Sequence, residues 1–183
     1  MKTLYLANNH LNDDDVILIA RALKRNTNLR LLRLGHNDLT ELGKNALSNA
    51  IYDSTSLNSV VDCNHACDIE DISNLLAISY FRENYLDTEP RVNKSCKIYH
   101  LLSKRNRDGN NVHHLNVEFD DEDDSLSLVP NVLASIQNYR FRAMLARRHY
   151  PDQVHPLSIM YEILRSWKMP QLYEYRCMTA KKK

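Results

Sequence analysis

The stretch LRLLRLGHNDLTELGKNAL, from Leu29 to Leu47, decides the fold expected for the first part of the chain. Over residues 31–34 the side chains alternate between buried and outward positions, which is typical of a short strand with one buried face. Thr40 is suited to cap a helix that begins directly after it. The stretch therefore predicts a strand, a tight turn around Asn37 and a helix, in that order.

The same pattern occurs once before and, less clearly, once after this stretch. The first copy begins at Leu4, and its helix has a suitable cap in Asn12 with Asp15 three residues later. We place a third copy from Leu57 onward. In the strand and turn of this alignment the matched residues are Leu4, Leu6, Asn9 and Leu11 of the first copy and Leu32, Leu34, Asn37 and Leu39 of the second. In the helix they are Ile19, Ala22 and Leu23 of the first copy and Leu47, Ala50 and Ile51 of the second. The third copy has Val60, His65 and Cys67 at places matched in the strand and turn.

Asn37 has a specific role in this pattern. It lies where the strand ends, so its side-chain amide can satisfy turn backbone groups of its own repeat and of the next one. The helix after it carries small and apolar residues at helical spacing, Ala46, Leu47, Ala50 and Ile51. This face is expected to pack on the strands.

These residues resemble the leucine-rich repeat of the ribonuclease-inhibitor type, over residues 4–57 and more weakly to about Ile78. The resemblance implies an α/β fold, a short leucine-rich-repeat arc with parallel strands on its concave side and helices on its convex side. We expect about three repeats in residues 1–85. Residues 86–183 are expected to form a mainly helical C-terminal cap with an acidic loop and a basic tail, because an uncapped stack exposes its core.

In this family the concave surface usually carries the ligand, so the outward columns of the strands are the candidate binding site. They comprise Thr3, Leu31 and Ser59, then Tyr5, Arg33 and Val61, then Ala7, Gly35 and Cys63, then Asn8, His36 and Asn64. The candidate partner-binding residues are Tyr5, Asn8, Leu31, Arg33, His36, Val61 and Asn64. Tyr and Arg are frequent anchors of protein interfaces. The alternative is that so short an arc grips nothing and these side chains are merely solvated.

The stretch VVDCNHACD, residues 60–68, raises the question of a metal site. In the proposed register Cys67 takes an inward place and behaves as a small apolar residue. His65 takes the turn place of Asn37, and Cys63 points in another direction, so four ligands do not converge. We therefore expect no metal and no cofactor. Asp62 falls in an inward place, which suggests that the strand pattern is distorted there.

The C-terminal half has three features of its own. The acidic run at residues 120–124 has no glycine at the bend and no closing glutamate, so a solvated loop is expected rather than a calcium site. HLNVEF, residues 114–119, is predicted as a further strand, on which His113 and His114 point apart. Two helices are predicted, one with Val129, Val132, Leu133, Ile136 and Tyr139 on one face, and one with Leu157, Met160, Tyr161 and Leu164 on one face, widened by Ile159 and Ile163.

No motif assembles a nucleophile, a base and an orienting group, so we expect no enzyme. The hypothesis is a non-catalytic protein-protein interaction module or scaffold subunit, whose partner is another protein bound at the concave face or the open N-terminal edge. One alternative is a regulator of a small GTPase that acts through Arg33 and Asn37. The other is an RNA-binding protein that uses the basic C-terminal third, with Arg140, Arg142, Arg147 and Arg148, although the near-neutral net charge makes nucleic acid an unfavoured partner.

The compartment is predicted from what the sequence contains. MKTLYLANNH has no apolar export segment, no apolar run reaches the length of a membrane span, and four cysteines show no disulfide framework. A cytoplasmic or nuclear protein is expected. The first repeat has no polar cap before it, so either repeats precede it or this edge meets a partner.

Overall fold

The computed structural model describes residues 2–70, 90–118, 130–137 and 155–166 of the chain. They belong to two compact units, Met1–Lys97 and Ile98–Lys183, and the division falls inside one helix, α5 (Pro90–Arg107). The sequence had placed this boundary at residues 85–86. Each unit is described below by itself.

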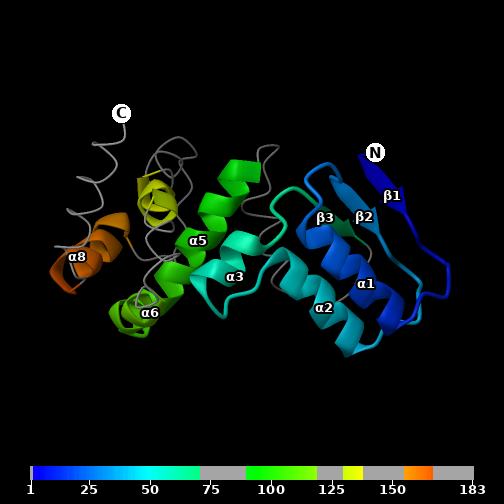
Figure 1. Cartoon of the computed structure of the whole chain (residues 1–183), viewed down its shortest axis with the longest axis horizontal. Coiled ribbons are helices and arrows are strands. Elements are labelled where there is room, and N and C mark those ends of the chain that lie inside the picture. The colour runs from blue at the N-terminus through cyan, green and yellow to red at the C-terminus, as the bar shows by residue number, and fades with distance from the viewer. Residues whose placement is uncertain (1, 71–89, 119–129, 138–154, 167–183) are drawn as a thin grey trace, which may run out of the picture. The chain divides into compact units, whose positions relative to one another are not determined.

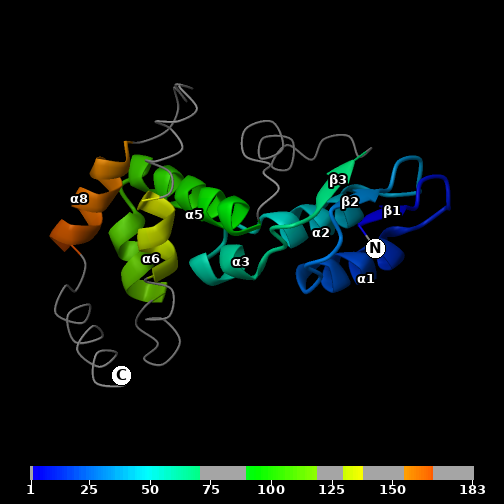
Figure 2. The same ribbon diagram turned by 90° about the horizontal axis from the view of Figure 1, so that it is seen from above.

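The first unit is built on a parallel sheet of three short strands, in the order β1 (Thr3–Tyr5), β2 (Leu31–Arg33) and β3 (Asp68–Glu70). Helices α1 (Asp13–Lys24) and α2 (Glu41–Ile51) connect the strands and pack against each other. Figures 1 and 2 show both helices together on one side of the three strands. The expected mixture of helices with parallel strands is therefore present in this unit.

Both long helices of this unit begin at the predicted residues. The Asn12 side chain accepts a hydrogen bond from the Asp15 N–H, and the Asp15 carboxylate accepts one from the Asn12 N–H, which makes a capping box. The Thr40 hydroxyl accepts a hydrogen bond from the Leu42 N–H at the start of α2. These caps satisfy backbone N–H groups that a helix leaves without internal partners.

The core between the strands and helices follows the predicted spacing. Leu32, Leu34 and Leu47 are at most 1% exposed, and Ala50 and Ile51 on α2 are also buried. Leu4, Leu6 and Ile19, the counterparts of Leu32, Leu34 and Leu47, are only partly buried against this core, whereas Leu23 is as buried as its counterpart Ile51. Apolar burial of this kind contributes roughly 25 cal/mol per Å².

The predicted register of the third copy is wrong. A short additional helix, α3 (Leu57–Asp62), follows α2, and the third strand begins only at Asp68. Leu4, Leu32 and Ile69 are the residues that lie in register across the sheet. Val60 is therefore a buried residue of α3 and not of a strand, and His65 does not take the turn place of Asn37. The α3 insertion accounts for the shift, because it lengthens the connection between the second and third strands.

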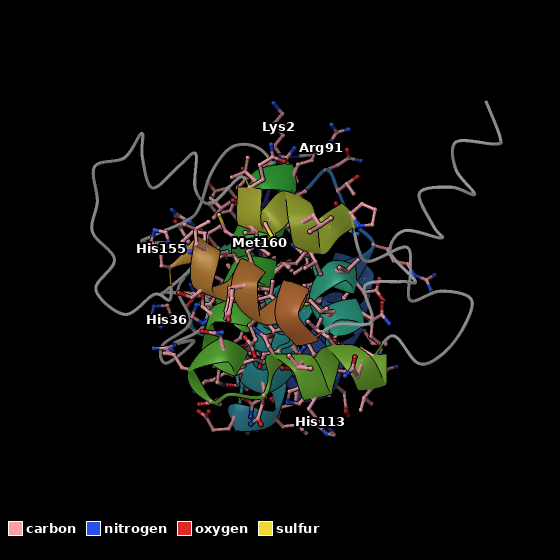
Figure 3. The ribbon with its side chains drawn as sticks, turned by 90° about the vertical axis from the view of Figure 1, so that its left-hand side faces the viewer. Lys2, His36, Arg91, His113, His155 and Met160 are labelled. Atoms are coloured by element: carbon pink, nitrogen blue, oxygen red, sulfur yellow. The ribbon has the colours of Figure 1, made fainter. Side chains whose placement is uncertain are left out.

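The second unit is helical in the described residues, with the second half of α5, α6 (Asn111–Glu118), a helical stretch at 130–137, and α8 (Pro156–Ser166). The predicted strand at 114–119 is wrong up to residue 118, because His114 and its neighbours belong to α6. His113 and His114 make an edge-to-face ring contact, and His113 points outward from α6 (Figure 3). Successive residues of a helix are 100° apart, which permits this contact between adjacent side chains.

Helices are present at both predicted places of the second unit, but only part of each predicted apolar face is buried in the described residues. Val132 and Ile136 are buried in the stretch 130–137, as their spacing predicts, whereas Leu133 of the same predicted face is 39% exposed. On α8 the predicted residues Ile159 and Ile163 are buried, whereas Leu157 is 57% and Tyr161 64% exposed. The acidic run at 120–124, the four basic residues at 140–148 and the C-terminal tail lie outside the described residues.

Polar side chains join the helices of the second unit. Arg105 on α5 forms a bidentate ion pair with Glu118 on α6, with Nη2–Oε1 and Nη1–Oε2 distances of 2.7 and 3.1 Å. Asn106 and Asn111 both donate to the Glu162 carboxylate on α8. Among the helices that the structure describes, none combines the length and apolarity needed to cross a membrane.

Candidate functional site

The outward face of the sheet brings together residues from all three strands. Thr3, Leu31 and Asp68 are neighbours in one row, and Tyr5, Arg33 and Glu70 form the next row. Alternate residues of a strand point to opposite sides, so this face is opposite to the core residues Leu32 and Ile69. The predicted neighbours on the first two strands, Thr3 with Leu31 and Tyr5 with Arg33, therefore lie side by side on this face.

The second row is linked by its own interactions. The Arg33 guanidinium donates from Nε and Nη2 to Glu70 Oε2, at 2.8 and 2.7 Å. It also lies over the Tyr5 ring, 5.4 Å from the ring centroid. Charge-assisted hydrogen bonds and cation–π contacts of this kind restrict the guanidinium to one orientation. Tyr5 itself stays 65% exposed, so the row offers an ordered aromatic surface to solvent.

The turns that follow the first two strands present a second pair of predicted residues. Asn8 and His36 occupy equivalent positions, and both have left-handed backbone conformations with φ of 58° and 55°. The Asn8 N–H donates to the Gly35 carbonyl at 3.0 Å, which continues the pairing of the strands into the turns. Both residues are exposed. Asn tolerates this conformation better than most residues, whereas His36 is held there by the surrounding pairing.

Asn37 holds these turns together. Its Nδ2 donates to the carbonyls of Leu34 and Leu6, both at 2.8 Å, and its Oδ1 accepts from the N–H groups of Asn9 and Leu11. The predicted role in its own repeat is confirmed. The second repeat that it reaches is the preceding one, however, and not the next. These four bonds position the turns that carry Asn8 and His36.

Two of the predicted partner-binding residues do not lie on this face. Val61 is part of α3, and Asn64 is only 2% exposed. The Asn64 side chain donates to the carbonyls of Leu23 and Asn26, both at 2.6 Å, and accepts from the N–H groups of Ala66 and Cys67. Its role is to fix the chain as it enters β3.

The residues that the sequence analysis missed are Glu70 and, in the same strand, Asp68, which is buried at 7% exposure. The sequence does hold a signal for the approximate start of the third strand. Asn26 accepts from the N–H groups two and three residues later, which is the pattern that Asn64 also shows. An alignment of NTNL, residues 26–29, with NHAC, residues 64–67, places the third strand shortly after Cys67, but one residue out of register, since it matches Leu31 with Ile69 whereas Leu31 pairs with Asp68.

The stretch around Cys63, His65 and Cys67 is a buried structural cluster in which Lys97 of α5 takes part. The Lys97 Nζ donates to the carbonyls of Ile51 and Asn64, each at 2.7 Å. Burial lowers the pKa of Lys97 to about 8, and burial with the nearby Lys97 charge lowers the pKa of His65 to about 3. Burial also raises the pKa of the Cys63 thiol and, with the Asp68 charge, that of Cys67 to about 12.

With these pKa values, the Cys63, Cys67 and His65 side chains are uncharged at neutral pH, and Lys97 is the charged group of the cluster. A protonated thiol is a poor nucleophile and a poor metal ligand. In the part of the chain that the structure describes, no group of three His, Cys, Asp or Glu side chains is arranged to hold a metal ion. The cluster therefore serves to connect the third strand and α2 with α5.

Comparisons with known proteins found no match for this chain among family models, curated proteins or solved structures. The function must therefore be inferred from the geometry of the sheet face itself.

Proposed function

We propose that the first unit is a short leucine-rich-repeat arc whose outward sheet face binds another protein, without catalysis. The observation that carries the proposal is the row Tyr5–Arg33–Glu70, in which ion pairing and ring contact order an exposed tyrosine before any partner arrives. Ordered aromatic and arginine side chains are frequent centres of binding energy at protein interfaces. Ordering in advance also lowers the entropy that binding must remove.

The rest of the face supports the same use. Leu31 lies next to Arg33 on β2 and is only half-buried, which adds apolar surface beside the row. Asn8 and His36 project from the turns beyond the strands and can supply polar contacts around it. An apolar centre with a polar edge is the usual composition of such interfaces.

The alternative of a GTPase regulator is less well supported by this geometry. A catalytic arginine must reach a phosphate, but the Arg33 guanidinium is directed at Glu70. The Asn37 side chain uses both its donor and its acceptor atoms in the turns. Either residue would have to abandon several hydrogen bonds to act on a nucleotide. Residues 140–148, on which the RNA alternative depends, lie outside the described part of the chain.

Site-specific photo-crosslinking in the native cells tests the proposal. A photoreactive phenylalanine analogue at Tyr5 is compared with the same analogue at Leu42, which is 62% exposed on α2, in the helical layer. We expect one reproducible adduct with a protein other than this chain from position 5 and none from position 42. Equal adducts at both positions, or adducts at position 42 alone, would contradict binding at the sheet face.

The identified partner then allows a direct affinity measurement. We expect Tyr5→Ala to weaken binding at least about tenfold, since truncated aromatic anchors commonly cost 2 kcal/mol or more. Leu42→Ala should leave the affinity unchanged. A Tyr5→Ala protein that is folded by circular dichroism and binds as tightly as the wild type would refute the proposal.

A further inference from the structure

At the end of the first unit formed by β1 and α1, several described residues are more exposed than their counterparts one repeat later. Leu32 and Leu34 are at most 1% exposed, whereas Leu4 and Leu6 are only partly buried. Ala50 is completely buried, whereas Ala22 at the same place of α1 is exposed. Leu18 is 63% exposed. An apolar surface in this position normally meets another layer of the same kind.

The strand at this end also has an unused edge in the described residues, because β1 pairs with β2 alone. The Lys2 carbonyl accepts from the Leu31 N–H, and the Leu6 N–H donates to the Arg33 carbonyl, so the backbone groups of these residues point toward β2. Backbone groups alternate in direction along a strand, and those of Thr3 and Tyr5 therefore face the open edge. Such an edge can pair with another strand.

Charge on α1 identifies the partner that fits. Asp14, Leu18, Ala22 and Arg25 are all exposed and follow one another at spacings of four, four and three, so they form one exposed stripe along α1. The stripe is acidic at its beginning, apolar in the middle and basic at its end. Two such stripes in antiparallel orientation bring each Asp14 to the Arg25 of the other helix and place the apolar residues between them.

The opposite end of the unit is closed. Lys97 donates to the carbonyls of Ile51 and Asn64, and Asn93 donates to the His65 carbonyl at 2.9 Å, so α5 covers that side. A head-to-tail stack of copies would need both ends open. An interface that uses one end alone is self-complementary and has twofold symmetry.

We propose that the β1–α1 end binds a second copy of this chain about a twofold axis. The axis runs perpendicular to the sheet, so β1 pairs with β1 and α1 packs on α1, both antiparallel. The inference uses another surface than the partner-binding face and does not depend on it. One strand and one helix of 12 residues make a small interface, at the lower end of the range for specific complexes, and we expect a dissociation constant on the order of micromolar.

Sedimentation equilibrium of the full chain, from about 1 to 300 µM, tests the dimer around this expected affinity. We expect a reversible monomer–dimer equilibrium. Leu18→Glu should abolish dimerisation, whereas Leu42→Glu, a matched change of an exposed leucine on α2, should not. A wild-type chain that is monomeric over the whole range, or a dimer that survives Leu18→Glu, would overturn the proposal.

A charge-exchange experiment tests the antiparallel geometry and guards against misfolded variants. Asp14→Arg and Arg25→Glu each place two like-charged pairs in the twofold interface, and each protein alone should dimerise at least about tenfold more weakly. Mixed in equal amounts, they should form a heterodimer, because both contacts then join opposite charges. Failure of the mixture to associate, when the wild type dimerises, would contradict the twofold arrangement.

Discussion

Asp13 belongs to the first turn of α1, but its carboxylate serves the neighbouring helix. It accepts hydrogen bonds from the Thr40 N–H, the Thr40 hydroxyl and the Gly43 N–H, at the start of α2. The hydrogen bonds from Thr40 lower the pKa of this carboxyl. Gly43 leaves the space that the carboxylate needs, since a Cβ there would lie 2.5 Å from Asp13 Oδ1. One acidic side chain thus links two helices whose sequences are 28 residues apart.

The effect of a methyl group at Gly43 should therefore depend on Asp13. Alanine is favoured over glycine inside a helix by about 1 kcal/mol. In an Asp13→Ala protein, Gly43→Ala should stabilise α2 by about this amount, because the space is then free. In the wild type the same change should give no gain or a loss, because the carboxylate must leave its three donors. Urea denaturation of the four proteins measures this, and equal effects of Gly43→Ala in both backgrounds would refute it.

At the scale of the element, α5 is joined to the first unit by the ammonium group of Lys97. The last residue of α2 is Ile51, and its carbonyl has no partner within the helix. Lys97 supplies a donor to this carbonyl and to that of Asn64, and the residue is only 4% exposed. A positive charge at the C-terminal end of a helix is favourable, but burial opposes the charge and lowers the pKa to about 8.

This lowered pKa predicts a pH dependence with a definite sign. Between pH 8 and the ordinary lysine pKa of 10.5, the unfolded chain binds a proton that folded Lys97 has released. Stability therefore rises with pH in this window, and the gain is lost as pH falls through 8. The free energy of unfolding of the wild type, minus that of Lys97→Met, should therefore increase by about 2–3 kcal/mol from pH 7.5 to 10.5.

Urea denaturation of both proteins across this range measures the difference. Cys63 and Cys67, whose thiols have raised pKa values, are present in both proteins, so their titration largely cancels. A difference that stays constant from pH 7.5 to 10.5 would show that Lys97 is not buried against these carbonyls.

At the scale of the whole molecule, the described residues of the first unit are less covered at its β1–α1 end than at the end where α5 packs. α2 packs on α1, and the elements that follow it contribute to its burial, whereas α1 lacks a neighbour on its outer side in the described residues. Local stability follows such differences in burial. We therefore expect β1 and α1 to unfold locally more often than β2 and α2.

Hydrogen exchange of the Leu18→Glu protein at low concentration measures this gradient. The amides of α1, from Val16 to Leu23, should exchange faster than those of α2. In the wild type, protection of α1 and of the Thr3 and Tyr5 amides should increase with protein concentration as the second copy binds. Equal protection of both helices in the variant would contradict the gradient.

The sequence by itself determined the features that depend on residues close in the chain. The caps at Asn12 and Thr40, the alternation in β2 and the repeat from Leu4 to Leu32 rest on contacts within one turn or between adjacent copies. Five of the seven predicted partner-binding residues lie on or beside the outward face for this reason. They are Tyr5, Asn8, Leu31, Arg33 and His36.

Only the tertiary structure decided where the third strand begins and which part of the predicted apolar face of α8 is buried. The α3 insertion breaks the regular spacing of the repeats. Just before β3, the Asn64 side chain donates to the carbonyls of Leu23 and Asn26, about 40 residues earlier in the chain, and these bonds fix where the strand begins. The apolar residues of α8 cover a wide face, of which Ile159 and Ile163 are buried while Leu157 and Tyr161 stay exposed. The adjacent Glu162 meets Asn106 and Asn111 from other helices. Partners so distant in sequence are brought together only by folding, so no local pattern could reveal which face they cover.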